Sequence, residues 1–258
     1  MDLSLLDSIA ILLMVGAVLQ GLAVSVISWI SRKESSLAKF IFSVLITAMS
    51  LTLLYETGIR LQFFANFPQF YFLPFYFSHS FGPLLFYYVK ATLYENFALK
   101  RSDLKHFLLP MAQFSFFVFI LFIDPQLKRD RWENDFSPLY GTFGYPVYLL
   151  LFTTYSYFAY RFIKFKIKAL DHIEHSKYEE KHVQRVRKMV KGLYFLLLIN
   201  SSFVICNFLS QYFFHYALNF NPIYRFFSDS SFAAMIIWVG AYGYYRVMRT
   251  VFSQETEG

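Results

Sequence analysis

Residues 6–30 read LDSIAILLMVGAVLQGLAVSVISWI, and this stretch decides the fold class. Its one ionisable side chain, Asp7, stands at the start, and no other follows until Arg32. A membrane-spanning helix needs about 20 mostly apolar residues, because the hydrocarbon core is about 30 Å thick and each residue rises about 1.5 Å. The stretch therefore predicts a transmembrane helix. Its acidic start and its length argue against a cleaved secretory signal.

Further stretches of the same character follow along the chain. In lipid the backbone must satisfy its own hydrogen bonds, so such runs form helices. Strands of a membrane barrel would instead alternate apolar and polar residues over about 10 positions. We predict an all-α, polytopic membrane protein with a seven-transmembrane-helix bundle as a single domain over residues 1–250, followed by a short polar tail, 251–258. The six further predicted spans are 37–55, 73–94, 107–123, 145–165, 190–214 and 226–247.

The composition of the whole chain agrees with this interpretation. Of 258 residues, 57% are hydrophobic and 16% are charged, whereas soluble domains carry about 25% charged residues. This excludes a soluble enzyme, a disordered regulator and a free nucleic-acid-binding module. The single cysteine, Cys206, excludes an intrachain disulfide and a zinc site built on several cysteines.

The distribution of basic residues predicts the orientation. If the amino terminus lies outside and the carboxyl terminus inside, most of the 24 lysines and arginines fall on the cytoplasmic side, as the positive-inside rule requires. We therefore predict a multi-pass protein of the bacterial inner membrane. The net charge of +7 then reflects topology and attraction to anionic lipid headgroups, and no direct contact with nucleic acid is expected.

Residues 166–189 form the longest predicted cytoplasmic segment. Ser176 and Glu179 have the spacing of a capping box, which predicts that a helix restarts here and runs into the sixth span. A helical hairpin with alternating charge would offer a docking site for a protein partner, with His172, Glu179 and Arg185 as candidate contacts. The alternative is a solvated hairpin without a partner.

The first span carries a stripe of small residues, Ala17, Gly21 and Ser25, four positions apart. Such a stripe lets another helix approach closely. The spacing leaves open whether that neighbour belongs to this chain or to a partner, so the three residues are also candidate docking residues.

Polar residues inside the predicted spans are candidates for an interior binding site, because polar groups are costly in lipid and tend to face the bundle interior. Those of span six stand seven and four residues apart and share one helical face. Two interpretations are open: these residues line a pocket for a small-molecule or lipid ligand, or they join helices by hydrogen bonds. The candidates are Glu56, His79, Tyr87, Asn200, Asn207, Gln211 and Asp229.

Established membrane chemistries find no support in the sequence. The last span has no lysine for a retinal Schiff base, and the six histidines do not form the clusters of a di-iron oxygenase. No phosphate-binding glycine loop or nucleophile elbow is present. We expect neither enzymatic activity nor a cofactor or metal ion.

Three short motifs suggest a family. Phe67-Pro68, then GPLLFYYVKATL at 82–93, then KHFLLP at 105–110, follow one another in an order and spacing that resembles the amino-terminal multi-pass membrane region of membrane-bound AraC-type regulators from Bacteroidota-like bacteria. The resemblance covers roughly residues 60–125 and implies a membrane-embedded input module. In that family a helix-turn-helix domain follows the last span, whereas residues 246–258 are too few for the three-helix core of such a domain.

These observations predict a non-enzymatic sensory or signal-relay module that acts through a cytoplasmic or membrane partner. The first alternative is an accessory structural subunit of a larger inner-membrane complex. A small-solute transporter is a further alternative, although the repeated halves typical of secondary carriers are not visible.

Overall fold

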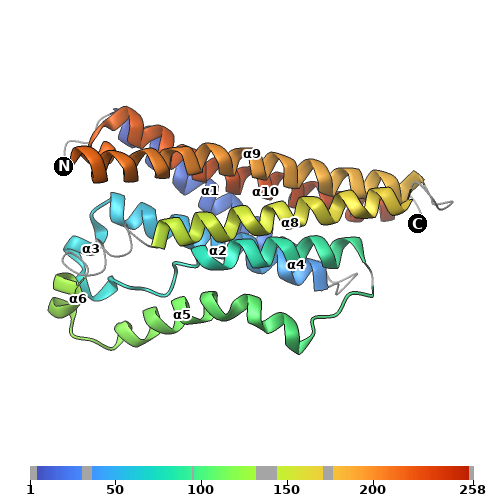
Figure 1. The fold of residues 1–258 in the computed structure, drawn as a ribbon, viewed down its shortest axis with the longest axis horizontal. Helices are drawn as coiled ribbons and strands as arrows, with labels where there is room; N and C mark the ends of the chain where they lie inside the picture. The colour runs from blue at the N-terminus through green and yellow to red at the C-terminus, as the bar shows by residue number, and fades with distance from the viewer. Residues whose placement is uncertain (1–4, 31–36, 95, 132–143, 171–176, 256–258) are drawn as a thin grey trace.

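The computed structural model describes residues 5–30, 37–94, 96–131, 144–170 and 177–255, and every regular element in these ranges is helical. The predicted all-α class is confirmed. The long helices lie side by side along one direction, and the two ends of the chain lie at opposite ends of the bundle (Figure 1). The long helices are α1 (Leu5–Ile30), α2 (Leu37–Arg60), α4 (Phe81–Leu93), α5 (Leu108–Leu121), α8 (Tyr145–Leu170), α9 (Lys177–Phe214) and α10 (Pro222–Glu255).

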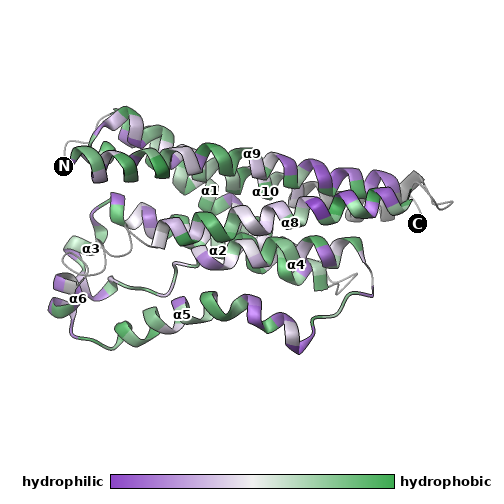
Figure 2. Cartoon of the chain, in the orientation of Figure 1, coloured by the Kyte–Doolittle hydropathy of each residue, from purple (hydrophilic) through white to green (hydrophobic). Residues whose placement is uncertain are grey.

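Four described segments are long and apolar enough to cross a membrane, which indicates a membrane protein. They are Leu5–Ile30, Leu37–Arg60, Arg101–Leu121 and Glu180–Phe214. Of the other predicted spans, α4 is short, and the tyrosines and charged residues of α8 and α10 lower their hydropathy (Figure 2). The count of seven spans and their orientation stay predictions.

The third predicted span, 73–94, differs most from the structure. Only α4 is α-helical there, and its 13 residues rise about 20 Å, less than the roughly 30 Å of a hydrocarbon core. The chain before it turns at Phe72, whose φ of 61° is left-handed. Side chains of α2 accept backbone hydrogen bonds in this segment: Phe72 N donates to Tyr55 Oη at 3.2 Å, and Phe77 N donates to Thr52 Oγ1 at 3.0 Å. Pro83 lies in the first turn of α4, where proline is tolerated.

At the C-terminal end of the bundle, where α8 and α9 meet, the helices extend beyond the predicted spans. The 38 residues of α9 rise about 57 Å, well over the thickness of a hydrocarbon core. Hydrophilic residues gather at this end (Figure 2). The hairpin predicted at 166–189 corresponds to the end of α8 and the start of α9, and its turn lies outside the described residues. Because α10 continues to Glu255, residues 251–255 of the predicted tail are helical.

The start of α9 packs onto the bundle. Val183 and Val186 are buried in the main hydrophobic core together with Leu170 at the end of α8. The Nε2 atom of His182 lies 3.4 Å from the backbone oxygen of Thr92 in α4. This end of α9 is therefore linked to α4 as well as to α8.

Short elements cover the opposite, N-terminal end of the bundle, where α1 begins and α2 ends. They are α3 (Phe63–Asn66), η1 (Pro68–Phe70) and α6 (Pro125–Arg131), over a second aromatic core. Lys128 of α6 is 4% exposed, and its Nζ donates to the backbone oxygen of Leu121 at 2.6 Å. Its burial lowers the pKa of the ammonium below the ordinary lysine value.

Candidate functional site

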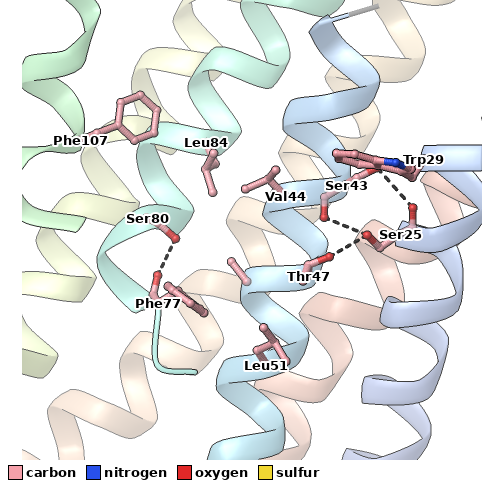
Figure 3. Close-up of a pocket in the computed structure, with 11 residues that line it drawn as sticks. Ser25, Trp29, Ser43, Val44, Thr47, Leu51, Phe77, Ser80, Leu84 and Phe107 are labelled. Carbon is pink, nitrogen blue, oxygen red and sulfur yellow. Dashed lines mark hydrogen bonds between the residues drawn. The ribbon is translucent and has the colours of Figure 1, made fainter. Parts of the chain in front are cut away.

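A pocket of about 450 Å³ opens between α1, α2, the start of α4 and Phe107, the residue before α5 (Figure 3). Its size is within the range of about 300 to 1,000 Å³ typical of small-molecule sites. Most of its lining atoms are carbon, and it contains no charged side chain. The lining residues are Ser25, Trp29, Ser43, Val44, Thr47, Ala48, Leu51, Phe77, Ser80, Leu84 and Phe107.

The hydroxyl groups of this pocket are already engaged in hydrogen bonds. Ser25 Oγ donates to the backbone oxygen of Ser43 at 3.1 Å and lies 2.7 Å from Thr47 Oγ1. Ser80 Oγ donates to the backbone oxygen of Phe77 at 2.7 Å. Figure 3 shows these contacts on the walls. Because the hydroxyls satisfy one another or the backbone, the pocket offers an entering molecule mainly apolar surface.

One wall borders on α5, which is apolar on all sides and buries only Gln113, Phe117 and Ile120. The Gln113 side chain joins α5 to the 3₁₀ turn η2 (Ser78–Ser80): its Oε1 accepts from His79 N at 3.3 Å, and its Nε2 donates to Ser78 Oγ at 3.2 Å. The rings of Phe114 and Phe77 stack with centroids 6.1 Å apart. Since Phe77 also lines the pocket, the contact between α5 and Phe77 lies next to the pocket.

Replacing Gln113 tests this attachment. Gln113→Leu removes both hydrogen bonds to η2, and we expect it to lower the free energy of unfolding by about 1 to 2 kcal/mol and to speed amide hydrogen exchange in α5. Ser115→Ala is the matched control, because Ser115 is exposed on the same helix. Thermal unfolding in detergent and exchange measured by mass spectrometry give the two readouts. Equal stability of the two variants would contradict this role for Gln113.

The predicted interior polar residues do not share one site, and none of them lines the pocket in Figure 3. His79 lies in η2, while Tyr87, in the middle of α4, donates from its Oη to Asp103 Oδ1 at 2.9 Å. Asn200 Nδ2 donates to Ser231 Oγ in α10 at 2.9 Å, which is a contact between helices. Asn207 is half-buried and Gln211 is exposed.

A polar and aromatic cluster surrounds Tyr87 in the middle of α4. His106 Nδ1 lies 2.7 Å from Tyr155 Oη in α8, and Lys90 Nζ lies 4.8 Å from the centre of the Phe97 ring. These contacts join α4, the 3₁₀ helix η3 (Arg101–Phe107) and α8. The His106–Tyr155 contact was not predicted, because the two residues are 49 positions apart in the sequence.

Two ion pairs connect α1, α2 and α10 at the N-terminal end of the bundle. Arg60 at the end of α2 pairs with Asp229 of α10, and Arg225 of α10 pairs with Asp7 of α1. The four side chains are 11 to 27% exposed. The half-buried Glu56 lies one helical turn before Arg60. Of the predicted interior residues, Glu56 and Asp229 therefore lie at the same end of the bundle.

The small-residue stripe of α1 faces helices of the same chain. Ala17 is 0% exposed, a Cβ atom on Gly21 would lie 2.1 Å from Ser50 Oγ in α2 and 3.0 Å from Ile236 in α10, and Ser25 bonds α2. This resolves the question left open by the spacing and corrects the assignment of these residues to partner docking: in this fold they are buried within the chain.

The docking residues predicted in the hairpin are only partly described. His172 and the side chain of Glu179 lie outside the described residues. Arg185 is half-buried on α9, between the buried Val183 and Val186. Around them, exposed lysines at the C-terminal end of the bundle are Lys164, Lys168, Lys181 and Lys188.

Within the described residues, no group of three histidine, cysteine, aspartate or glutamate side chains is arranged to hold a metal ion. No protein-family model matches the chain, and no curated protein or solved structure is significantly similar to it. The functional interpretation therefore rests on the geometry of the chain itself.

Proposed function

We propose that this chain is a bacterial inner-membrane protein that crosses the bilayer seven times, and that it acts as a non-enzymatic sensory or signal-relay module. Its ligand is an apolar small molecule or a lipid held in the pocket between α1, α2, α4 and Phe107. The observation that carries this proposal is the pocket itself, which has the volume of a ligand site, apolar walls and hydroxyls that are already bonded.

The orientation in this proposal has the amino terminus outside and the carboxyl terminus in the cytoplasm. The opposite placement of the two chain ends supports an odd number of crossings (Figure 1). Exposed lysines where α8 and α9 meet support a cytoplasmic position for that end. The third crossing is then α4 together with the irregular segment before it.

The relay would run from α4 to the cytoplasmic end of the bundle. Leu84 of α4 lines the pocket. On α4, Gly82 lies against α8, since a Cβ atom there would be 3.0 Å from the Leu151 oxygen, and Thr92 contacts His182 of α9. A ligand that binds better to one position of α4 would thus shift the population of α8 and α9 positions. A partner at the cytoplasmic end would detect this shift.

Photolabelling tests the pocket. A fatty acid with a diazirine in its chain, added to the purified protein, should label segment 37–60 when it is irradiated. Thr47→Trp fills the pocket and should lose this label, whereas Leu19→Trp, on an exposed position of α1, should keep it. Circular dichroism verifies that both variants are folded. Equal labelling of segment 37–60 in the two variants would exclude the pocket as the binding site.

A distance measurement in the same preparation tests the relay. Spin labels on Lys164→Cys and Lys188→Cys, in a Cys206→Ser background, report the separation of α8 and α9 at exposed positions. Binding of oleate should change this distance by about 1 to 2 Å, the size of common helix shifts. An unchanged distance with the pocket occupied would reject the relay.

An accessory subunit is the second candidate, and aromatic residues at the end of α9 favour it. Tyr212, Phe213 and Phe214 are 67, 66 and 78% exposed, and clustered exposed apolar side chains often mark contacts with a partner or with lipid. Purification in mild detergent discriminates between the candidates. A stoichiometric complex that persists would support the accessory subunit. A monomer that still binds the fatty acid would support the sensory or signal-relay module.

A further inference from the structure

One face of α2 carries a lysine followed by three residues that line the pocket. Lys39, Ser43, Thr47 and Leu51 stand four residues apart, so they share one side of the helix. The last three line the pocket, and Figure 3 shows them in sequence along α2. Lys39 is half-buried and lies one turn before Ser43.

The same end of the pocket has the features of a membrane interface. Trp29, 62% exposed, lies there beside Ser43 (Figure 3), and its ring is 5.6 Å from that of Phe40. Tryptophan is enriched at the headgroup level of bilayers. The 3₁₀ helix η3 contributes Phe107 to the pocket and carries the exposed Arg101 and Lys105.

The opposite end of the pocket is apolar. Leu51 of α2 and Phe77, before α4, form it, and neither they nor their lining neighbours carry a charge. No side chain that lines the pocket is charged. Lys39 stands one turn before Ser43 on α2, so the basic residue nearest in sequence to the lining lies beyond the end marked by Trp29 and not beyond the end formed by Leu51 and Phe77. An amphiphile with a long chain and an anionic head matches this arrangement, whereas a polar solute would find the indole N–H of Trp29 and hydroxyls that are already bonded.

We propose that the pocket holds one acyl chain of an anionic phospholipid from the cytoplasmic leaflet, with its phosphate beside Lys39. This inference rests on the proposed function, because it names the ligand class of the same pocket. The charge of Lys39 selects the anionic headgroup, and the walls formed by α1, α2 and α4 take the chain. Occupancy would then report the anionic lipid content of the leaflet.

Lipid titration followed by native mass spectrometry tests the proposal on the delipidated full-length protein. We expect dioleoyl phosphatidylglycerol to bind about fivefold more tightly than dioleoyl phosphatidylcholine, which is the effect of one basic residue near an anionic lipid. Lys39→Gln should reduce this ratio to about one, and Lys39→Arg should keep it. Lys164→Gln is the control, because Lys164 is exposed at the same end of the bundle and does not line the pocket.

The outcomes separate this inference from the proposed function. Equal affinity of the wild type for the two lipids, or a preference that survives in Lys39→Gln, would overturn the headgroup assignment while photolabelling of the pocket remains. Displacement of phosphatidylglycerol by an equal concentration of oleate would make a free fatty acid the occupant and would also overturn it. If Thr47→Trp binds both lipids as the wild type does, the pocket is not the site and the proposed function fails as well.

Discussion

Gly192→Ala is expected to destabilise the protein by about 2 to 3 kcal/mol, because the added methyl group has no space. A Cβ atom on Gly192 would lie 2.3 Å from Trp238 Cζ2 and 2.6 Å from its Nε1. The indole cannot move away freely, since Nε1 donates to the backbone oxygen of Met189 at 3.1 Å. The variant must therefore either separate α9 from α10 or break this hydrogen bond.

Gly16→Ala is the matched control for this prediction. No atom lies within 4 Å of the Cβ position at Gly16, and alanine is favoured over glycine inside a helix by about 0.5 to 1 kcal/mol. We expect this variant to be as stable as the wild type or slightly more stable. The free energy of unfolding, measured by titration with sodium dodecyl sulfate in mixed micelles, compares the two.

A double variant shows whether the indole is the cause. Trp238→Phe provides a smaller ring, so adding Gly192→Ala to it should cost less than adding the same change to the wild type, which gives a coupling energy between the two positions. If the two glycine variants unfold at the same detergent fraction, α9 and α10 do not pack through Gly192.

The sequence predicted the helices whose apolar runs are long and uninterrupted, since such a run in lipid has no other way to satisfy its backbone. At 73–94 only Phe81–Leu93 is α-helical, although the whole stretch was predicted as one span. There the backbone bonds to Tyr55 and Thr52 of α2. A run of apolar residues does not reveal that the side chains of another helix replace its own hydrogen bonds, so this start of α4 was not predictable.

The pocket was not predicted for a different reason. Thr47, Leu51 and Phe77 are ordinary residues for a transmembrane segment, and only their meeting in space forms a cavity. None of the polar residues predicted to form an interior site lines this pocket. Asn200 joins α9 to α10 through a hydrogen bond to Ser231. The spacing had left open whether Asn200 lines a pocket or joins helices in this way. Ser25 was selected as part of a packing stripe, and it lines the pocket as well.

The ion pairs at the N-terminal end of the bundle could not be predicted from residue spacing. Asp229 was selected as a polar residue in a predicted span, but its partner Arg60 is 169 residues away in the sequence. Asp7 and Arg225 are 218 residues apart. No local pattern couples such positions, so these ion pairs emerge only when α1, α2 and α10 are assembled.

Asp229→Ala should destabilise the protein by about 2 to 3 kcal/mol, because it leaves Arg60 without its carboxylate. Breaking a fully buried pair costs about 3 to 5 kcal/mol, and the lower value follows from the 18% and 21% exposure of the two side chains. Asp229 also attracts Arg225 and repels Asp7, so its removal should leave the ion pair between Arg225 and Asp7 in place. Asp130→Ala, at an exposed position of α6 at the same end of the bundle, should have little effect.

Exchanging the charges distinguishes the ion pair from the space that Asp229 fills. Arg60→Asp combined with Asp229→Arg restores opposite charges across the α2–α10 contact, and it should recover part of the stability that either change alone removes. Recovery stays partial because the new arginine faces Arg225 and the new aspartate faces the side of Glu56, one turn away on α2. Unfolding in mixed micelles at low and high salt measures both effects. If Asp229→Ala unfolds at the same detergent fraction as Asp130→Ala, the Arg60–Asp229 contact does not hold α2 to α10. The same conclusion follows if the exchanged pair is less stable than both single variants.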